Sequence, residues 1–182
     1  LQSSAASDVY KRQGIREGEK VVSILPLDRE LIQNPEGHYI IFATSQGRIK
    51  RSHLSDYVKI NRNGKYALKF AKDNDSLVQV RPATKEDHVV LVSSMGYACR
   101  FLPSEAKTRV DAATGESTTT HTVRVQGRVS QGVAGMKLQS GDRVVGMIVT
   151  DDFDTSVLTI SKHGMAKRSR LGSGSMIKIK LE

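Results

Sequence analysis

The stretch HYIIFATSQGRIKRSHLSDY, residues 38–57, places an apolar run before Gly47 and the basic pair Lys50 and Arg51 three and four residues after it. Such a run, broken by a glycine and then resumed, is typical of two short strands joined by a tight turn. Two later stretches repeat the arrangement, and they are HVVLVSSMGYACRFLPSEA at 88–106 and SVLTISKHGMAKRSRL at 156–171. The chain is therefore predicted to be built from a repeated β-hairpin unit.

The three hairpins also agree position by position. Three residues before the glycine each carries Thr or Ser, two residues after it Ile or Ala, and four residues after it arginine. The repeat length is about fifty residues, with an insertion in the second interval. We assign the insertion to residues 110–122, a polar stretch rich in Thr that is predicted to form a long loop.

A second element precedes the hairpins. Residues 18–22 and 141–145 both have the order Gly, acid, base, Val, Val, and residues 67–80 are a degraded version. Each unit is then an apolar strand, an acidic turn, a second strand, a loop and the glycine hairpin. The predicted fold class is all-β, a propeller-like array of four-stranded sheets, or blades, that is incomplete at about three blades.

The predicted repeats span residues 14–171, divided at about 14–63, 64–131 and 132–171. Residues 1–13 have neither a helical nor a strand period, and we expect a disordered or non-native arm there. Residues 172–182 begin with Gly-Ser-Gly-Ser and are expected to be a flexible or non-native tail, although their apolar residues alternate as in a strand.

The composition excludes several classes of protein and indicates the kind of partner. The chain has 182 residues, 28 Lys and Arg against 19 Asp and Glu, and a net charge of +9. The longest apolar runs are far shorter than the ~20 residues that a membrane helix needs, so no membrane partner is expected. A single cysteine, Cys99, excludes an intrachain disulfide and a Cys-rich zinc site. The positive charge favours a polyanionic partner such as nucleic acid.

Candidate catalytic and metal-binding residues are few. The five histidines have no metal-ligand spacing and are more simply surface or turn residues. Asp151, Asp152 and Asp154 form an acidic cluster that suits a weak cation site or acid–base carboxylates, but a solvated turn explains them better. Cys99 occupies a strand position. No catalytic residue, no metal site and no cofactor are predicted for this chain.

The basic residues recur in register, which distinguishes them from scattered surface charge. Equivalent turns of successive blades lie at equivalent places, so the repeated charges would form a basic track suited to a DNA backbone. Adjacent strand residues point to opposite faces, so some of these side chains would instead cover apolar surface or pair with acids. The predicted DNA-binding residues are Lys50, Arg51, Arg62, Lys65, Arg100, Arg124, Arg128, Lys167, Arg168 and Arg170.

Three motif types resemble the C-terminal β-pinwheel domain of the A chain of DNA gyrase and, less closely, that of topoisomerase IV. The hairpin motif is carried by residues 42–57 and 160–171, the blade junction by GRVSQGVAGMKLQSGDRVVGM at 127–147, and the opening by EGEKVVSILPL at 17–27. The resemblance covers roughly residues 14–171. The heptapeptide QRRGGKG that marks gyrase is absent, so the sequence does not choose between gyrase and topoisomerase IV.

The resemblance implies a β-pinwheel of which this chain holds an interior part. It implies a non-catalytic module that binds and wraps double-stranded DNA around basic blade edges, within an ATP-hydrolysing type II topoisomerase. The implied partners are the remaining blades and the N-terminal domain of the A subunit, and the B subunit. Mg²⁺ and ATP are implied for the whole enzyme only, and the implied location is the bacterial cytoplasm, in association with the nucleoid.

An alternative function is a propeller-like scaffold for protein partners, in which the basic residues are only solvated. An independent hydrolase is disfavoured, because no convergent catalytic set is visible. One structural observation bears on the choice between the first two functions. It is whether one continuous outer surface is lined by Arg51, Arg100, Arg168 and their lysine neighbours.

Overall fold

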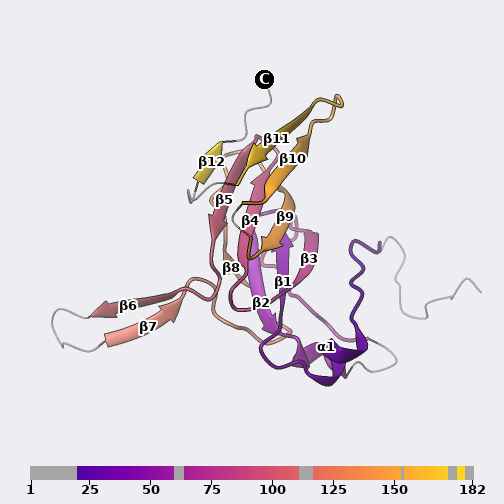
Figure 1. Cartoon of the computed structure of the whole chain (residues 1–182), viewed down its shortest axis with the longest axis vertical. Helices are drawn as coiled ribbons and strands as arrows, with labels where there is room; N and C mark the ends of the chain where they lie inside the picture. The colour runs from indigo at the N-terminus through magenta and orange to yellow at the C-terminus, as the bar shows by residue number, and fades with distance from the viewer. Residues whose placement is uncertain (1–19, 60–63, 111–116, 153, 172–175, 179–182) are drawn as a thin grey trace, which may run out of the picture.

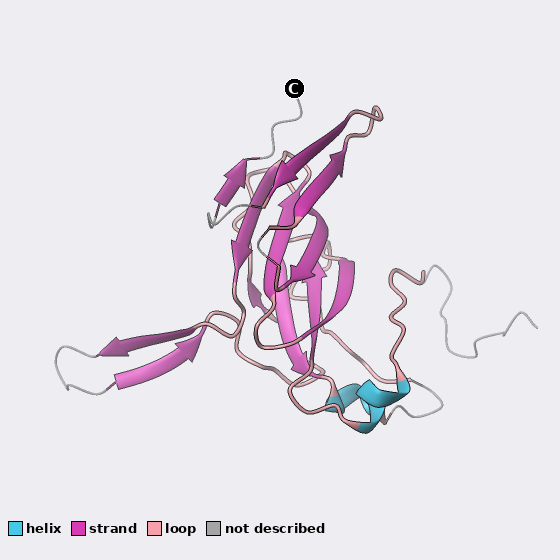
Figure 2. Ribbon diagram, viewed as in Figure 1, coloured by secondary structure: helices cyan, strands magenta, loops and turns pink. Residues whose placement is uncertain are grey.

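The computed structural model describes residues 20–59, 64–110, 117–152, 154–171 and 176–178, and strands dominate this part of the chain (Figure 2). The all-β prediction is confirmed. The elements, labelled in Figure 1, are α1 (Arg29–Gln33), β1 (Tyr39–Thr44), β2 (Arg48–His53), α2 (Ser55–Val58), β3 (Leu77–Ala83), β4 (His88–Ser93), β5 (Tyr97–Phe101), β6 (Ala106–Val110), β7 (Ser117–His121), β8 (Val133–Ala134), β9 (Val144–Thr150), β10 (Ser156–Ile160), β11 (Ala166–Arg170) and β12 (Met176–Lys178).

Each of the three predicted glycines lies in a tight turn between antiparallel strands. The hairpins are β1–β2, β4–β5 and β10–β11. Gly47, Gly96 and Gly164 have φ values of 76°, 80° and 83°, which an L side chain rarely adopts. The hairpin prediction is confirmed at all three positions.

The recurring hydroxyl three residues before each glycine stabilises the turn. The amide of Arg48 donates to Thr44 Oγ1 at 3.3 Å, and the amide of Tyr97 donates to Ser93 Oγ at the same distance. In the third hairpin Ser161 Oγ accepts from the amide of Met165 at 3.1 Å. A Ser or Thr repeated there thus satisfies a main-chain donor that the turn would otherwise leave open.

Two four-stranded sheets stand at the centre of the described structure. Their strand orders are β3-β1-β2-β8 and β9-β4-β5-β12, so the two sheets have equivalent topology. β10 and β11 form a two-stranded sheet, and so do β6 and β7. In each large sheet the hairpin pairs with a strand that follows it in the chain and with a strand from beyond the next hairpin.

The sheets therefore cross the expected repeat boundaries at 63 and 131. We expected each hairpin to share a sheet with the strand before it, whereas β3 joins the hairpin of 39–53 and β9 joins the hairpin of 88–101. A buried carboxylate before each strand gives the physical reason. Asp75 Oδ1 accepts from the hydroxyl of Ser45 at 3.0 Å, and Asp142 Oδ1 accepts from the hydroxyl of Ser94 at 2.8 Å. Each acidic turn is thus fastened to the preceding hairpin.

Apolar side chains on both faces of these strands form the core. One cluster lies between the two large sheets and includes Ile41 and Leu91, which are fully buried. A second covers the outer face of β1 with residues from α1, α2 and the segment before α1. A third, around Val90, joins the second sheet to the β10–β11 hairpin. The blades are therefore stacked against one another in chain order.

Two segments differ from expectation. The region 110–122 was expected to be a loop, but its described part contributes to the β6–β7 hairpin, which projects from the body in Figure 1. Threonines favour strands, and Thr108 faces Thr119 across the pair, so a polar composition concealed a strand pattern. Within 172–182, where a flexible tail was expected, β12 pairs with β5 as β8 pairs with β2. The predicted arm at 1–13 lies outside the described residues.

Candidate nucleic-acid interface

Lys50, one of the predicted DNA contacts, lies in the interior. Its residue exposure is 1%, and its ammonium group donates to the main-chain oxygens of Ala67 at 2.6 Å and Arg128 at 2.5 Å. The same group lies 5.2 Å from the ring centre of Phe42. Burial lowers the pKa of Lys50 to about 8, although nearby Asp56 opposes that shift. Lys50 joins β2 to two connecting segments and is not presented to a ligand.

Arg51 is also buried, on the opposite face of β2. It is 4% exposed, and its guanidinium lies 4.9 Å from the ring centre of Tyr39. Its Nε and Nη1 atoms have no hydrogen-bond partner, and burial lowers its pKa. The expectation of a continuous basic track through all three hairpins is therefore revised, because the two predicted residues of the first hairpin, Lys50 and Arg51, are interior. β8 and the segment after β7 cover this strand, since Val133 pairs with it and Val125 forms a bridge to Arg51.

Three further predicted residues lie near the first hairpin. Arg128 is half-buried and donates through Nη1 to the main-chain oxygen of Asp56 at 3.3 Å. Lys65 is exposed, and its Nζ donates to the main-chain oxygen of Lys59 at 2.5 Å. Arg62 lies outside the described residues. Of these, Lys65 is the one that the structure places at the surface.

The third hairpin has its three predicted residues at the surface. Lys167, Arg168 and Arg170 of β11 are all exposed, and Arg168 and Arg170 line an open polar hollow of about 410 Å³. Both face the same side of the sheet, since they pair with Leu158 and Ser156 of β10. Two arginines on one side and a lysine on the other give this hairpin positive charge on both faces. In the second hairpin Arg100 is half-buried.

Basic residues also line two further hollows, and these residues were only partly predicted. Arg124 is exposed and lines an open polar hollow of about 640 Å³ together with Lys69. Lys72 and Arg143, also exposed, line a third hollow of about 520 Å³ beside the buried Asp142. Sequence reasoning missed Lys72 and Arg143 and left Lys69 out of the DNA-binding set. The signal available for Arg143 was the repeated acid–base pair at 142–143, which has a counterpart at 19–20.

Asp152 and Cys99, considered above for catalytic or metal-binding roles, contact other groups of the protein. Asp152 accepts from the amide of Asp154 at 2.8 Å and the hydroxyl of Thr155 at 2.7 Å, and these hydrogen bonds lower its pKa. Cys99 is buried, which raises the pKa of its thiol, and it faces the main-chain oxygen of Gly135 at 3.7 Å. Within the described ranges, no group of three or more His, Cys, Asp and Glu side chains is placed to hold a metal ion.

No helix in the described part of the chain has both the length and the apolar character needed to span a membrane. Stacked antiparallel sheets of identical strand order, with basic residues at repeated hairpin positions, define a blade-type β-repeat protein. The sequence profile described as "DNA gyrase C-terminal domain, beta-propeller" matches residues 38–84, 117–151 and 155–173, more than half of the chain. The chain belongs to the DNA gyrase C-terminal domain family.

Curated relatives agree with this assignment. The DNA gyrase A subunit of Staphylococcus epidermidis (strain ATCC 12228) is 33% identical over 154 residues, and that of Staphylococcus aureus (strain NCTC 8325) is 32% identical over the same length. Each match covers 84% of this chain but 15% of the relative. The chain therefore spans a small part of the length of the gyrase subunits that it resembles.

Solved structures show the same fold. The C-terminal domain of DNA topoisomerase IV superposes with a TM-score of 0.65 at 24% identity, over 82% of this chain and 40% of that one. The DNA gyrase A C-terminal domain gives a TM-score of 0.56, also at 24% identity, over 76% of this chain and 43% of that one. The resemblance noted from the motifs is thus confirmed for family and for fold.

Proposed function

We propose that this chain is a DNA-binding and DNA-wrapping module of a type II topoisomerase A subunit. The observation that carries the proposal is the exposed basic surface of β11, formed by Lys167, Arg168 and Arg170 on a family-specific hairpin. Arg124, Lys69 and Lys65 are also exposed and add positive charge elsewhere on the surface. A net charge of +9 gives the whole chain long-range attraction for a polyanion.

The proposed binding is to the phosphate backbone. Arginine and lysine neutralise phosphates and release counterions, and this gives affinity without reading the bases. Aromatic residues make up 5% of the chain, which does not favour a stacking platform for single strands. Sequence preference is then slight and arises from how easily a given duplex bends. Lys50 contributes indirectly, by joining two connecting segments to β2.

The wider setting is part of the same proposal. The module would act beside further blades and the N-terminal domain of the A subunit, together with the B subunit, in the bacterial cytoplasm at the nucleoid. Bending duplex DNA around the blade edges would give strand passage its direction. Mg²⁺ and ATP would serve other domains of the whole enzyme, while this chain's own task is to hold DNA.

Binding to a short duplex at several salt concentrations tests the proposal. If about six basic side chains reach phosphates, log K should fall against log salt with a slope on the order of −5. Retention of binding with a slope near zero, or no binding in low salt, would support the protein scaffold instead. Wrapping is tested separately, with a plasmid relaxed by an added topoisomerase in the presence of the chain. We expect little change in linking number and no cleavage without added enzyme.

A further inference from the structure

The β6–β7 hairpin extends from the body of the chain into solvent (Figure 1). Within the described residues β6 and β7 pair with each other and with no other strand. The side chains of the hairpin that the structure describes are all exposed, and they are Ala106, Lys107, Thr108, Ser117, Thr119, Thr120 and His121. A two-stranded hairpin that buries no apolar side chain adds little to folding. A ligand outside the chain would give these two strands a use.

The root of the hairpin is held by the core. Val123, two residues after β7, is 1% exposed, and its amide donates to the main-chain oxygen of Pro103 at 2.9 Å. The amide of Thr122 donates to the main-chain oxygen of Glu105, also at 2.9 Å. The hydroxyl of Thr122 donates to the carboxylate of Glu105 at 3.3 Å, so this acid is paired at the root. The hairpin therefore leaves the body in a fixed direction, which reduces the entropy lost on binding.

The two strands carry cations and hydroxyls. Residues 106–110 and 117–121 contain one lysine, one arginine, one histidine and five Ser or Thr residues, and they contain no acid. Asp111 and Glu116 belong to the connecting segment, which lies outside the described residues. The described strands thus suit an anionic ligand that accepts and donates hydrogen bonds.

The register separates the hairpin into two faces. Lys107 pairs with Thr120, and Thr108 pairs with Thr119. Adjacent strand residues point to opposite faces, so Lys107 and Thr120 share one face and the other two threonines share the second. On the second face the two hydroxyls lie 3.3 Å apart and bind each other. The first face therefore offers a cation and a hydroxyl to a ligand.

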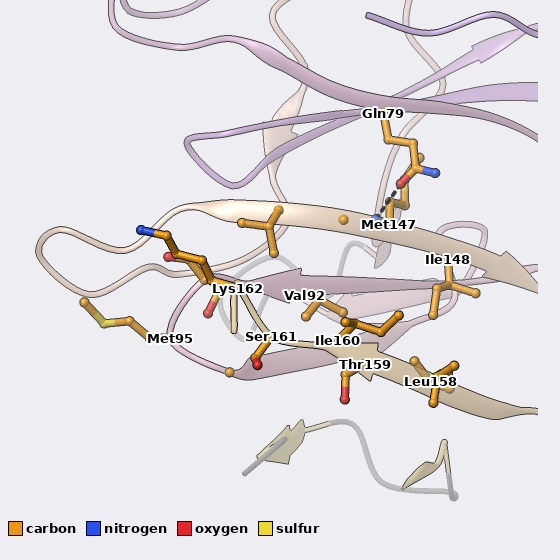
Figure 3. Close-up of a pocket in the computed structure, with 16 residues that line it drawn as sticks. Gln79, Val92, Met95, Met147, Ile148, Leu158, Thr159, Ile160, Ser161 and Lys162 are labelled. Carbon is orange, nitrogen blue, oxygen red and sulfur yellow. Dashed lines mark hydrogen bonds between the residues drawn. The ribbon is translucent and has the colours of Figure 1, made fainter. Parts of the chain in front are cut away.

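A protein is a poor occupant for this face. Protein interfaces are anchored by aromatic and other apolar side chains, and the two strands have no aromatic residue. A predominantly apolar cavity of about 780 Å³ lies elsewhere, lined by Val92, Ile148 and Ile160 (Figure 3). β10, which borders that cavity, and the β6–β7 hairpin are at different ends of the molecule in Figure 1. The hairpin has the hydrogen-bonding character of a nucleic-acid contact instead.

We propose that the β6–β7 hairpin lies in the major groove of duplex DNA, with the face of Lys107 and Thr120 toward the bases. This inference rests on the proposed function and adds a groove contact to it. The major groove is about 12 Å wide and admits a two-stranded β-ribbon. Each strand has five residues, and at about 3.3 Å per residue it is about 16 Å long, more than the width of the groove.

The groups on and near this face match the parts of the groove. The ammonium group of Lys107 donates to phosphate oxygens at the groove wall. The hydroxyl of Thr120 donates to the main-chain oxygen of Lys107 at 3.3 Å, so its lone pairs are left to accept from base amino groups. Arg124, three residues beyond β7, is exposed and shares the open hollow of about 640 Å³ with Lys69. The duplex is then held by phosphate contacts at the root and by groove contacts along the strands.

A variant without the hairpin tests the groove contact. Replacing residues 106–121 by Asn-Gly joins Glu105 to Thr122 through a two-residue turn, and the hydrogen bond that closes such a turn is already present between them. Parent and variant are titrated with two duplexes of one sequence, containing either cytosine or glucosylated 5-hydroxymethylcytosine, whose sugar occupies the major groove. The parent should bind the modified duplex roughly tenfold more weakly, and the variant should bind both duplexes within about twofold. Circular dichroism and urea unfolding check that the variant is folded.

The outcomes separate this inference from the proposed function. Equal binding of the two duplexes by the parent would overturn the groove contact and leave DNA binding in place. A folded variant that is as sensitive to the modification as the parent would also overturn it, because the groove contact would then lie elsewhere. A parent chain that binds neither duplex in low salt would overturn both proposals.

Point substitutions test the assigned face without shortening the chain. Thr120→Val should weaken duplex binding about threefold to tenfold, because one hydrogen bond to the DNA is lost. Thr119→Val makes the same change on the opposite face and should leave binding within about twofold. Lys107→Gln should make the salt slope less steep by about 1. Equal effects of the two threonine substitutions, or an unchanged slope with Lys107→Gln, would overturn the assigned face.

Discussion

The ammonium group of Lys50 and the main-chain oxygen of Arg128 lie 2.5 Å apart, although 78 positions separate the two residues in the chain. The lysine also binds the main-chain oxygen of Ala67. One side chain therefore fastens two connecting segments to β2, and its charge is buried where those segments meet.

Stability should depend on the ionisation of Lys50. Its pKa is about 8 in the folded chain against 10.5 for an ordinary lysine, so between these values the unfolded chain binds more protons and stability rises with pH. The gain approaches about 1.4 kcal/mol per pH unit within this window. Urea unfolding of the parent and of Lys50→Met at pH 8 and pH 9.5 measures the effect as a difference. A difference that does not change with pH would show that Lys50 titrates normally.

Removing charge from β11 should weaken DNA binding. The triple variant Lys167→Ala, Arg168→Ala and Arg170→Ala loses up to three phosphate contacts, so the salt slope should become less steep by about 2 to 3. Fluorescence anisotropy with a labelled duplex gives both the affinity and the slope. Lys85→Ala is the control, because Lys85 is exposed but lies in an ion pair with Glu86. An unchanged slope in the triple variant would remove β11 from the interface.

Arg51 should matter for stability more than for DNA binding. Its guanidinium is buried with Nε and Nη1 unpaired, and replacing a buried charge by an apolar side chain of similar volume is often neutral or stabilising. We expect Arg51→Met to raise the free energy of unfolding by about 1 kcal/mol and to leave the salt slope unchanged. Thermal or urea unfolding and the same anisotropy titration measure the two effects. A flatter slope would mean that Arg51 reaches the DNA after all.

The glycine turns should differ in their tolerance of alanine. At Gly47 a Cβ atom would clash with the main-chain oxygen of Met136, whereas at Gly164 it would meet nothing within 4 Å. Both residues have positive φ, which costs alanine about 1–2 kcal/mol. Gly164→Ala should therefore lose about that amount, and Gly47→Ala clearly more. Urea unfolding compares them, and equal losses would contradict the close approach of the 136 segment to the first turn.

The sequence was sufficient for the hairpins because their determinants are local. A tight turn between two strands is favoured by a glycine with positive φ, a hydroxyl three residues earlier and apolar runs on both sides. The family followed from the same short motifs. The exposed arginines of β11 were also predicted, since no later segment covers that strand within the described residues.

The burial of Lys50 and Arg51 was not predictable in the same way. Strand alternation shows that the two point to opposite faces, but it does not show that both faces of β2 are covered. The covering segments come from far along the chain, and a lysine that binds main-chain oxygens leaves no partner signature in the sequence. Strand pairing was missed for a related reason: period-2 patterning identifies a strand without identifying its neighbour.

Strand β8, which joins the first sheet from beyond the second hairpin, affects how the chain folds. β2 gains this neighbour only after the whole second hairpin and the β6–β7 insertion have been made, because β8 follows both in the chain. Closing such distant pairs is entropically costly and slows folding. The first sheet cannot be completed before the second hairpin has been synthesised. The two large sheets should therefore unfold in one cooperative transition. Because each large sheet includes a strand from beyond the next hairpin, neighbouring blades form a single folding unit, even though each has its own hairpin.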